Sequence, residues 1–405
     1  MTDTAHPQAL SGTRVLDLTR LLPGPYATYI LAGYGADVVK VEDTGAGDYA
    51  RHSPPLEASD LGAAFTASNA GKRSIAIDLK TDEGRAVFRR MVQGADVLVE
   101  SFRPGVMHRL GLDYAELSEI NPALVYCAIS GYGQNTRRAA LAGHDLNYQG
   151  VAGLLSQRVE GEPEALPPAL LGDLVGGSFS AVIAIMAALL ERRASGRGRF
   201  IDISIAHGAM ALMPLVSVAA VNGEVVKPFG RTALSGGNPA YGIYVASDGR
   251  RVALGALEHK FWKTFCLRTG LDDLAEWRPE GDDAADAVVR QRLETLFRSR
   301  SAKEWETLGA QWDVCLTATA SVSEALDGAR TEGLPVFDSY ARDTSRGGVR
   351  VEVLKGVCAD LTQMSRVLTP PPQQGEYTHS LMSEAGYSDA DIAAYLAAGI
   401  VKGPQ

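Results

Sequence analysis

Two short polar stretches, GHDLNY (143–148) and LLGDLVGGS (170–178), carry side chains that can transfer protons. In the first, His144 stands beside Asp145, and in the second, Asp173 precedes paired glycines and an apolar run. An imidazole changes its charge near neutral pH, and a buried carboxyl group can keep its proton there. If folding brings His144 and Asp173 together, they have the composition of a two-group acid–base site.

Asp173 also has a purely structural interpretation. An aspartate just before a helix commonly caps the first-turn amides and is stabilised by the positive end of the helix dipole. The glycines Gly172, Gly176 and Gly177 favour the functional interpretation, because a backbone without side chains allows a ligand to approach closely. Propensity alone favours the helix cap, so both interpretations stay open at this point.

The first half of the chain alternates apolar strands with helices, and these elements must position the polar stretches. The pattern predicts strands at 14–18, 36–42, 73–79, 95–100, 123–130 and 199–205, and helices at 23–35, 81–93 and 178–194. Strands and helices in this alternation indicate βαβ units around a parallel sheet. The apolar run 179–190 is shorter than a membrane span and is predicted to be a buried core helix.

The pattern changes after the sixth strand. Residues 222–240 are rich in Gly, Pro and Ser, and the dipeptide Asp248-Gly249 lies between two strand-like runs, which predicts a hairpin. Helical patterns follow near 259–270, 285–299 and 302–310. We therefore expect a large domain over 1–224, a smaller α+β domain over 225–325, and a segment 326–405 that returns to the large domain.

Composition and failed motifs narrow the function. The net charge of −9 over 405 residues argues against nucleic-acid and membrane-surface partners, which need a basic field. The four widely spaced cysteines and the histidines have no metal-ligand spacing, and no secretory signal is recognisable, so we expect a cytoplasmic protein without a metal. Walker A, GxGxxG, GxSxG and HExxH motifs are all missing, which disfavours NTPases, nicotinamide dehydrogenases, α/β-hydrolases and common zinc enzymes.

Several motifs in order resemble the class III CoA-transferase (CaiB/BaiF) family, most closely its α-methylacyl-CoA racemase branch. They are LLPGPYATYILAGYGADVVKVE (21–42), NAGKRSIAIDLK (69–80), ESFRPGVMHRLGL (100–112), AISGYGQ (128–134), GHDLNY, GDLVGGS, GRGRFIDISI (196–205) and LGALEHKFW (254–262). The resemblance implies an acyl-CoA substrate, a Rossmann-like large domain that binds the CoA portion, and an interlocked, ring-like homodimer. It implies no permanently bound cofactor.

Two chemistries occur in this family. In transferases the residue matching Asp173 is the nucleophile, forming a mixed anhydride and then an enzyme-bound thioester. In racemases the residues matching His144 and Asp173 move a proton on and off C2 from opposite faces, and the match to Glu258 supports the histidine. The histidine in the first stretch favours a racemase of 2-methyl-branched acyl-CoA, acting through an enolate, over a transferase moving CoA between carboxylic acids.

Further site residues follow from the resemblance. For the CoA portion we expect contacts from Lys40, Lys72, Arg73, Phe102, Arg103, Arg109, Tyr132 and Gly133, with Arg103 and Arg109 the first choices for phosphate. Supporting roles are expected for Asp145, Asn147, Gly172, Gly236 and Gly237, with Asp145 anchoring its loop and the Gly172 amide near the enolate oxygen. The sequence departs from the family at DTGAGD (43–48) and NTRRAAL (135–141), next to the expected adenine contacts and His144.

Overall fold

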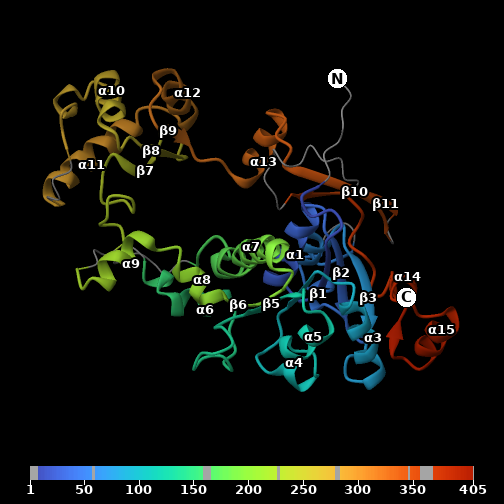
Figure 1. The fold of residues 1–405 in the computed structure, drawn as a ribbon. Coiled ribbons are helices and arrows are strands. Elements are labelled where there is room, and N and C mark those ends of the chain that lie inside the picture. The colour runs from blue at the N-terminus through green and yellow to red at the C-terminus, as the bar shows by residue number, and fades with distance from the viewer. Residues whose placement is uncertain are drawn as a thin grey trace. The chain divides into compact units, whose positions relative to one another are not determined.

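The computed structural model describes residues 8–56, 60–157, 166–225, 229–278, 283–344, 347–355 and 368–404 (Figure 1). The chain divides into two compact units. Unit 1 consists of Met1–Leu154, Pro167–Leu212 and Leu334–Gln405, and unit 2 of Leu155–Leu166 and Met213–Gly333. The predicted domain limits stay a prediction, and this division differs from them in assigning 155–166, 213–224 and 326–333 to the second unit.

Unit 1 is built on a seven-stranded sheet in the order β12-β3-β2-β1-β4-β5-β6. Its strands are β1 (Arg14–Leu18), β2 (Asp37–Glu42), β3 (Arg73–Ile77), β4 (Val97–Glu100), β5 (Val125–Ser130), β6 (Phe200–Ser204) and β12 (Val401–Lys402). The strands β1 to β6 pair in parallel, and β12 pairs antiparallel with β3. The predicted parallel sheet is confirmed, and its strand order reverses between β1 and β4.

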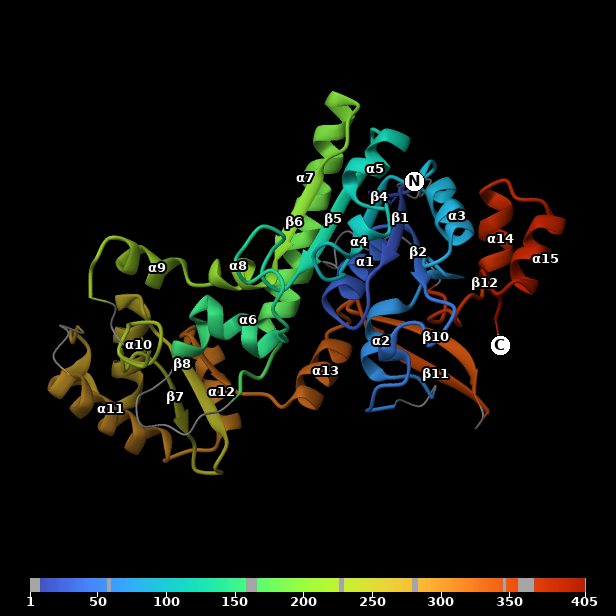
Figure 2. The same cartoon turned by 90° about the horizontal axis from the view of Figure 1, so that it is seen from below.

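Helices cover both faces of this sheet (Figure 2). One face packs against α1 (Pro23–Gly33) and α7 (Ser180–Ser195), through residues such as Val15 and Ile185. The other packs against α3 (Asp82–Val92), α5 (Tyr114–Ile120), α14 (Thr378–Glu384) and α15 (Asp389–Ala397). Alternate residues of β1, Val15 and Leu16, enter the two different cores, as strand geometry requires.

The helix predicted at 178–194 is longer than its apolar pattern suggested. A π-helical segment, η3 (Gly172–Phe179), runs directly into α7. Together they form a 24-residue apolar helix that passes a length and hydropathy test for membrane spans, a test that core helices also pass. Ala181, Ile185 and Leu189 of α7 are buried in the core of unit 1, as predicted, whereas its opposite face is exposed.

Several short elements of unit 1 were not predicted from the sequence. They are η1 (Tyr49–Arg51), α2 (Ala63–Asn69), α4 (Val106–Arg109), α6 (Asp145–Ala152), η2 (Leu154–Ser156), α8 (Ile205–Met210) and the hairpin of β10 (Phe337–Thr344) with β11 (Gly347–Leu354). The hairpin packs Tyr340 and Val351 against Tyr29 of α1. These elements are too short, or too weakly patterned, for periodicity to reveal them.

Unit 2 contains a three-stranded antiparallel sheet, β7 (Tyr241–Val245), β8 (Arg251–Gly255) and β9 (Leu316–Ala318). The predicted hairpin turns at Gly249, whose φ is +78°. The helices are α9 (Pro214–Val221), α10 (His259–Thr269), η4 (Asp272–Leu274), α11 (Asp283–Phe297), α12 (Ala302–Trp312) and α13 (Val322–Thr331). An aromatic core of Trp262, Phe265, Phe297 and Trp305 holds α10, α11 and α12 on the sheet.

Buried ion pairs fix the strand ends of unit 1. The Lys72 ammonium lies 2.9 Å from the Asp17 carboxylate, and the Lys40 ammonium lies 2.8 Å from Asp48; all four side chains are fully buried. Lys72 also donates to the hydroxyl of Thr28 and the carbonyl of Pro25. Through this network of contacts the Lys72 ammonium ties the start of β3 to the end of β1 and to α1.

Removing one partner of this network is expected to be costly. Lys72→Met leaves the Asp17 carboxylate buried without its nearest cation, so the free energy of unfolding should fall by about 3–5 kcal/mol. The exposed pair of Lys303 with Glu306 provides a control, and Lys303→Met should cost less than about 1 kcal/mol. Urea unfolding of both variants measures the difference, and equal small losses would contradict this account.

Candidate active site

The reversal of strand order between β1 and β4 places two loops together at the carboxyl ends of the strands. The backbone N–H of Arg20, after β1, donates to the Ser101 hydroxyl, after β4, at 3.3 Å. The Arg20 guanidinium pairs with Asp43 at 2.6 Å and lies over the rings of Tyr49 and Phe102. Open α/β sheets bind ligands at such a reversal. Arg20 was not among the residues predicted from the sequence, although its place directly after the first strand could have indicated it.

Glu100 shapes the loop that carries the predicted CoA contacts. Its carboxyl group is buried at the end of β4 and accepts a hydrogen bond from the Phe102 backbone N–H at 2.7 Å. Burial, with a smaller contribution from Asp202, raises the pKa of Glu100 to about 8. Glu100 is therefore mainly protonated at neutral pH and adds little negative charge beside Phe102 and Arg103.

Arg103 and Arg109 are both exposed, and within the described part of the chain neither has a carboxylate partner among the ion pairs. The positive charge of Arg103 lowers the pKa of Tyr148, against the larger effect of burial, which raises it, so Arg103 lies within electrostatic reach of the stretch 143–148. Available guanidinium groups near the strand ends are suited to phosphate. Their role, with that of Phe102, stays a prediction.

The structure does not support the phosphate role predicted for Lys40 and Lys72. Both ammonium groups are fully buried and already paired, with Asp48 and Asp17 respectively. If an ammonium group left such a pair to bind phosphate, the carboxylate would stay buried without its cation. That loss of a charge partner is unfavourable. The spacing of these lysines in the sequence gave no sign that their partners lay inside the unit.

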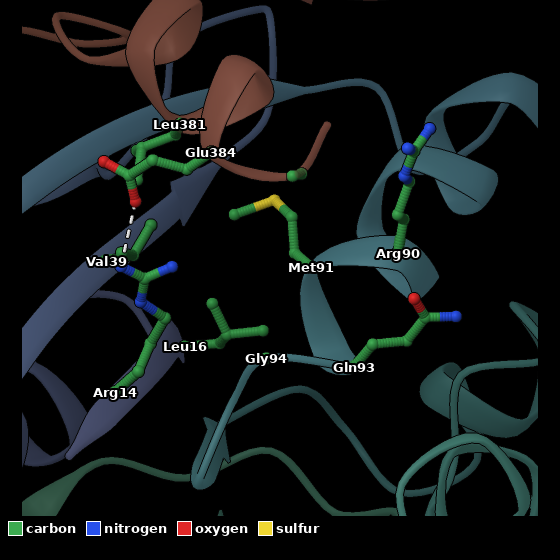
Figure 3. A pocket seen from close by; sticks show the side chains of 10 residues that line it. Arg14, Leu16, Val39, Arg90, Met91, Gln93, Gly94, Leu381 and Glu384 are labelled. Atoms are coloured by element: carbon green, nitrogen blue, oxygen red, sulfur yellow. Dashed lines mark hydrogen bonds and ion pairs between the residues drawn. The ribbon is translucent and has the colours of Figure 1, made fainter. Parts of the chain in front are cut away.

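Arg73 is also committed elsewhere, at the opposite end of the strands. It pairs with Asp37 and Glu384, both at 2.6 Å, and Arg14 pairs with the same two carboxylates. Figure 3 shows Arg14 and Glu384 beside a cavity of about 310 Å³ that Met91 enters. This four-charge cluster fastens α14 to the sheet, and the CoA contact of Arg73 stays a prediction that would have to compete with these ion pairs.

His144 is exposed and begins α6 as its N-cap residue. Its backbone N–H donates to the Asn147 side-chain oxygen at 3.0 Å, which gives Asn147 the supporting role predicted for it. The Tyr148 hydroxyl donates to the carbonyl of Gly143 at 2.5 Å, so the residue before His144 is held as well. Backbone geometry around the imidazole is therefore fixed from both sides.

Tyr132 and Gly133, predicted to contact CoA, have structural partners in this loop. Tyr132 is buried and packs edge-on against the Tyr148 ring, with centroids 5.2 Å apart. Gly133 turns the chain after β5 with a φ of +85° and donates its N–H to the Ser130 hydroxyl at 3.1 Å. Tyr132 thus supports the loop of His144 rather than presenting a free ring to a ligand.

Asp173 lies in the first turn of η3, beside the start of α6. Its backbone N–H donates to the Asp145 carboxylate at 2.9 Å. Burial, and secondly the negative charge of Asp145, raise the pKa of Asp173 to about 7. Since Asp145 directly follows His144, this hydrogen bond joins the segments that carry the two predicted proton carriers, and the anchoring role of Asp145 stays a prediction that this contact supports. Asp173 is not the N-cap that propensity favoured.

The glycines near Asp173 serve protein packing. A Cβ on Gly172 would lie 2.9 Å from the Asp145 carboxylate, and one on Gly176 would lie 2.4 Å from the Ile205 carbonyl oxygen in α8. A Cβ on Gly177 would lie 3.1 Å from Pro23. The prediction that these bare positions admit a ligand is wrong for Gly176 and Gly177, whose space is filled by α8 and α1. π-Helical turns of this kind are frequent at functional sites.

Three predicted site residues belong to unit 2. Glu258 is exposed at the N-cap position of α10. Gly236 has a φ of +104°, and its carbonyl accepts a hydrogen bond from Arg290. Gly237 packs against the Arg231 backbone. Their predicted roles, including support of His144 by Glu258, stay predictions. Among the described residues of both units, no cluster of three His, Cys, Asp or Glu side chains has the arrangement of a metal site.

The raised pKa of Asp173 makes a prediction for stability. The folded chain holds this proton up to about pH 7, whereas the ordinary value is 3.8, so the contribution of Asp173 to folding falls as the pH rises between them. Asp173→Asn should therefore gain stability relative to the natural protein as the pH rises from 4 to 8, by up to about 4 kcal/mol, because one pKa unit corresponds to about 1.4 kcal/mol. Urea unfolding at several pH values measures this; a pH-independent difference, like that expected for exposed Asp327→Asn, would contradict it.

Comparison with known proteins agrees with this architecture. The sequence pattern of the family described as CoA-transferase family III matches residues 10–378. Alpha-methylacyl-CoA racemase of Mus musculus is 34% identical over 370 residues, 85% of this chain and 92% of that protein. Succinate–glutarate CoA-transferase of Agrobacterium fabrum is 33% identical over 400 residues, 93% of this chain and 95% of that protein.

A crystal structure of a CaiB/BaiF family protein from Brucella suis is similar to this one with a TM-score of 0.78. The identity is 26%, and the match covers 94% of this chain and 100% of the other. These similarities lead to one conclusion: the chain belongs to CoA-transferase family III.

Proposed function

We propose that the protein is a racemase or epimerase of 2-methyl-branched acyl-CoA thioesters. The observation that carries the proposal is the hydrogen bond from the Asp173 N–H to Asp145, the residue next to His144. It brings an imidazole and a protonated carboxyl group to the starts of two neighbouring helices. Inversion at C2 needs two such groups, because a single base tends to return the proton to the face from which it came.

Asp173 is suited to the acid role. Burial and the charge of Asp145 raise its pKa to about 7, so it carries a proton in a large fraction of molecules at neutral pH. In one direction neutral His144 takes the C2 proton while Asp173 donates one to the opposite face. In the other direction Asp173 takes the proton and protonated His144 donates.

The enolate that forms between the two transfers needs stabilisation of its oxygen. His144 is the N-cap of α6, so the first-turn amides of that helix and its positive dipole end lie beside the imidazole. Amides at this position favour a developing negative charge without reorganisation. Arg103 and Arg109 would bind the CoA phosphates, and Arg20 with Phe102 lies at the strand reversal where the nucleotide end is expected.

A CoA-transferase acting between carboxylic acids is the alternative. The similarity to succinate–glutarate CoA-transferase supports it, because that protein matches the chain over nearly its whole length. In this mechanism Asp173 attacks the thioester as a carboxylate. The raised pKa of Asp173 disfavours that step, since it reduces the ionised fraction near neutral pH.

Isotope exchange separates the two chemistries. Incubation of a 2-methylacyl-CoA with the protein in deuterated water should place deuterium at C2 without any added acid, as measured by mass spectrometry. The label enters because the proton removed by one group exchanges with solvent before the other returns one. CoA transfer to a free carboxylic acid without C2 label would reject the racemase and establish the transferase.

Replacement of the imidazole tests the assignment of His144. His144→Ala should reduce C2 exchange by about 10²-fold or more, because proton transfer by a positioned side chain contributes on this scale. His379→Ala is the matched control, since His379 is an exposed histidine on α14. Equal exchange rates in the two variants would remove His144 from the mechanism.

We propose further that the protein is a homodimer. Phe179, Ile183 and Leu190 form an apolar stripe along η3 and α7 and are exposed, Ile183 by 70%. An amphipathic core helix normally directs polar residues to solvent, so this face is suited to a second copy of the chain. The interlocked arrangement implied by the family resemblance is part of this proposal.

Charge on the stripe should disrupt the assembly. Ile183→Glu together with Leu190→Glu is expected to give a monomer in light-scattering measurements, because dimer formation would bury two carboxylates from each chain. Glu191→Gln, a change on the same helix outside the stripe, should remain dimeric. A dimer in the double variant, or a monomer in the natural protein, would contradict the assignment of this face.

A further inference from the structure

Gln149, one turn after Asp145 in α6, is buried completely, although long polar side chains are mostly exposed in proteins. Its Nε2 donates to the Asp145 Oδ2 at 2.5 Å. Its Oε1 is buried and has no hydrogen-bond partner among the described residues. Gln149 is thus held in the interior by one interaction, and that interaction is with the carboxylate that holds Asp173.

The two oxygens of Asp145 each receive an N–H donor. Oδ1 accepts from the Asp173 backbone at 2.9 Å, and Oδ2 accepts from Gln149. No side-chain hydrogen bond to the Asp173 carboxyl group occurs within the described residues. When two carboxyl groups interact, the one that receives more donors favours the charged form, and the other favours the proton.

We propose that Gln149 is a positioning residue that assigns the negative charge of this pair to Asp145 and leaves the proton on Asp173. The inference rests on the proposed racemase function for its catalytic meaning. Gln149 touches no reacting atom. It acts through Asp145, and it leaves Asp173 protonated and able to donate that proton to C2. Rotation of the Gln149 amide by half a turn would direct its Oε1 toward residue 145. Gln149 could therefore also accept a hydrogen bond from a variant that carries a donor at position 145.

Other ionisable groups lie on the elements that pack against η3. They are His144 and Tyr148 at α6, Tyr26 and Tyr29 on α1, His207 on α8 and Asp202 on β6, and those of α7 lie in its last turns. Of these elements, only α6 contributes a charge that shifts the pKa of Asp173, through Asp145. The protonation of Asp173 therefore depends on burial and on Asp145, the group that Gln149 contacts.

Gln149→Met tests the proposal with a side chain of similar size and no donor. Aspartate labelled with ¹³C at the carboxyl carbon reports protonation directly, with signals assigned from Asp145→Asn and Asp173→Asn. Near pH 6 the Asp173 signal should move toward its ionised position in Gln149→Met. C2 exchange should slow about tenfold or more, since hydrogen bonds to charged groups are among the stronger ones, while the KM for the acyl-CoA stays nearly unchanged. Gln93→Met, an exposed change after α3, should alter neither readout.

A double substitution shows whether the effect passes through Asp145. In Asp145→Asn the neutral amide that replaces the carboxylate can keep both contacts, because a rotated Gln149 amide offers Oε1 to the new donor. Gln149→Met should then slow exchange far less in the Asp145→Asn background than in the natural one. Equal slowing in both backgrounds would overturn the proposal by showing that Gln149 acts through packing.

Gln149→Glu keeps the proposal testable if the methionine variant does not fold. The introduced carboxyl group can donate to Asp145 when it is protonated, whereas it repels Asp145 when it is ionised. Exchange relative to the natural protein should therefore fall as the pH rises from about 5 to about 8. A ratio that does not depend on pH would contradict the proposal.

The failure of this proposal and the failure of the racemase function are distinguishable. Absence of C2 exchange in the natural protein rejects the racemase. An Asp173 carboxyl signal that Gln149→Met leaves unchanged rejects the role of Gln149, whichever reaction the protein catalyses.

Discussion

The site depends on one hydrogen bond between segments far apart in the sequence. The Asp145 carboxylate accepts the N–H of Asp173 at 2.9 Å, and because His144 precedes Asp145, the same bond holds the segments that carry His144 and Asp173 next to each other. Its charge also has a chemical effect, since it helps to raise the pKa of Asp173 to about 7. Position and protonation are therefore controlled by the same carboxylate.

The rest of unit 1 makes this contact possible. The π-helical turn η3 requires glycines because α8 and α1 approach its backbone closely at Gly176 and Gly177. The parallel sheet brings the loops after β1, β4 and β5 to one end, where ligands bind in folds of this type. Fully buried ion pairs of Lys40 and Lys72 hold the strand ends that carry these loops.

The sequence predicted the parallel sheet and its main helices, because buried strands and helices leave clear periodic patterns. It also singled out His144, Asp145 and Asp173, whose segments the structure brings together. It did not reveal the ion pairs of Lys40, Lys72 and Arg73, since a cation in a sequence does not show which carboxylate it will meet. It missed Arg20 and Gln149 for the same reason: their importance comes from partners distant in the chain or hidden by burial. The π-helical segment η3 has only eight residues, which are too few for a periodic pattern of side chains to reveal it in the sequence.

The central claim is that His144 and Asp173 face one carbon atom from opposite sides. A crystal structure with a bound 2-methylacyl-CoA tests it most directly. The account predicts C2 between the imidazole and the Asp173 carboxyl group, about 3–3.5 Å from each, with the thioester oxygen toward the α6 amides. A complex with the thioester carbonyl carbon against the Asp173 carboxylate, and His144 remote from C2, would contradict it.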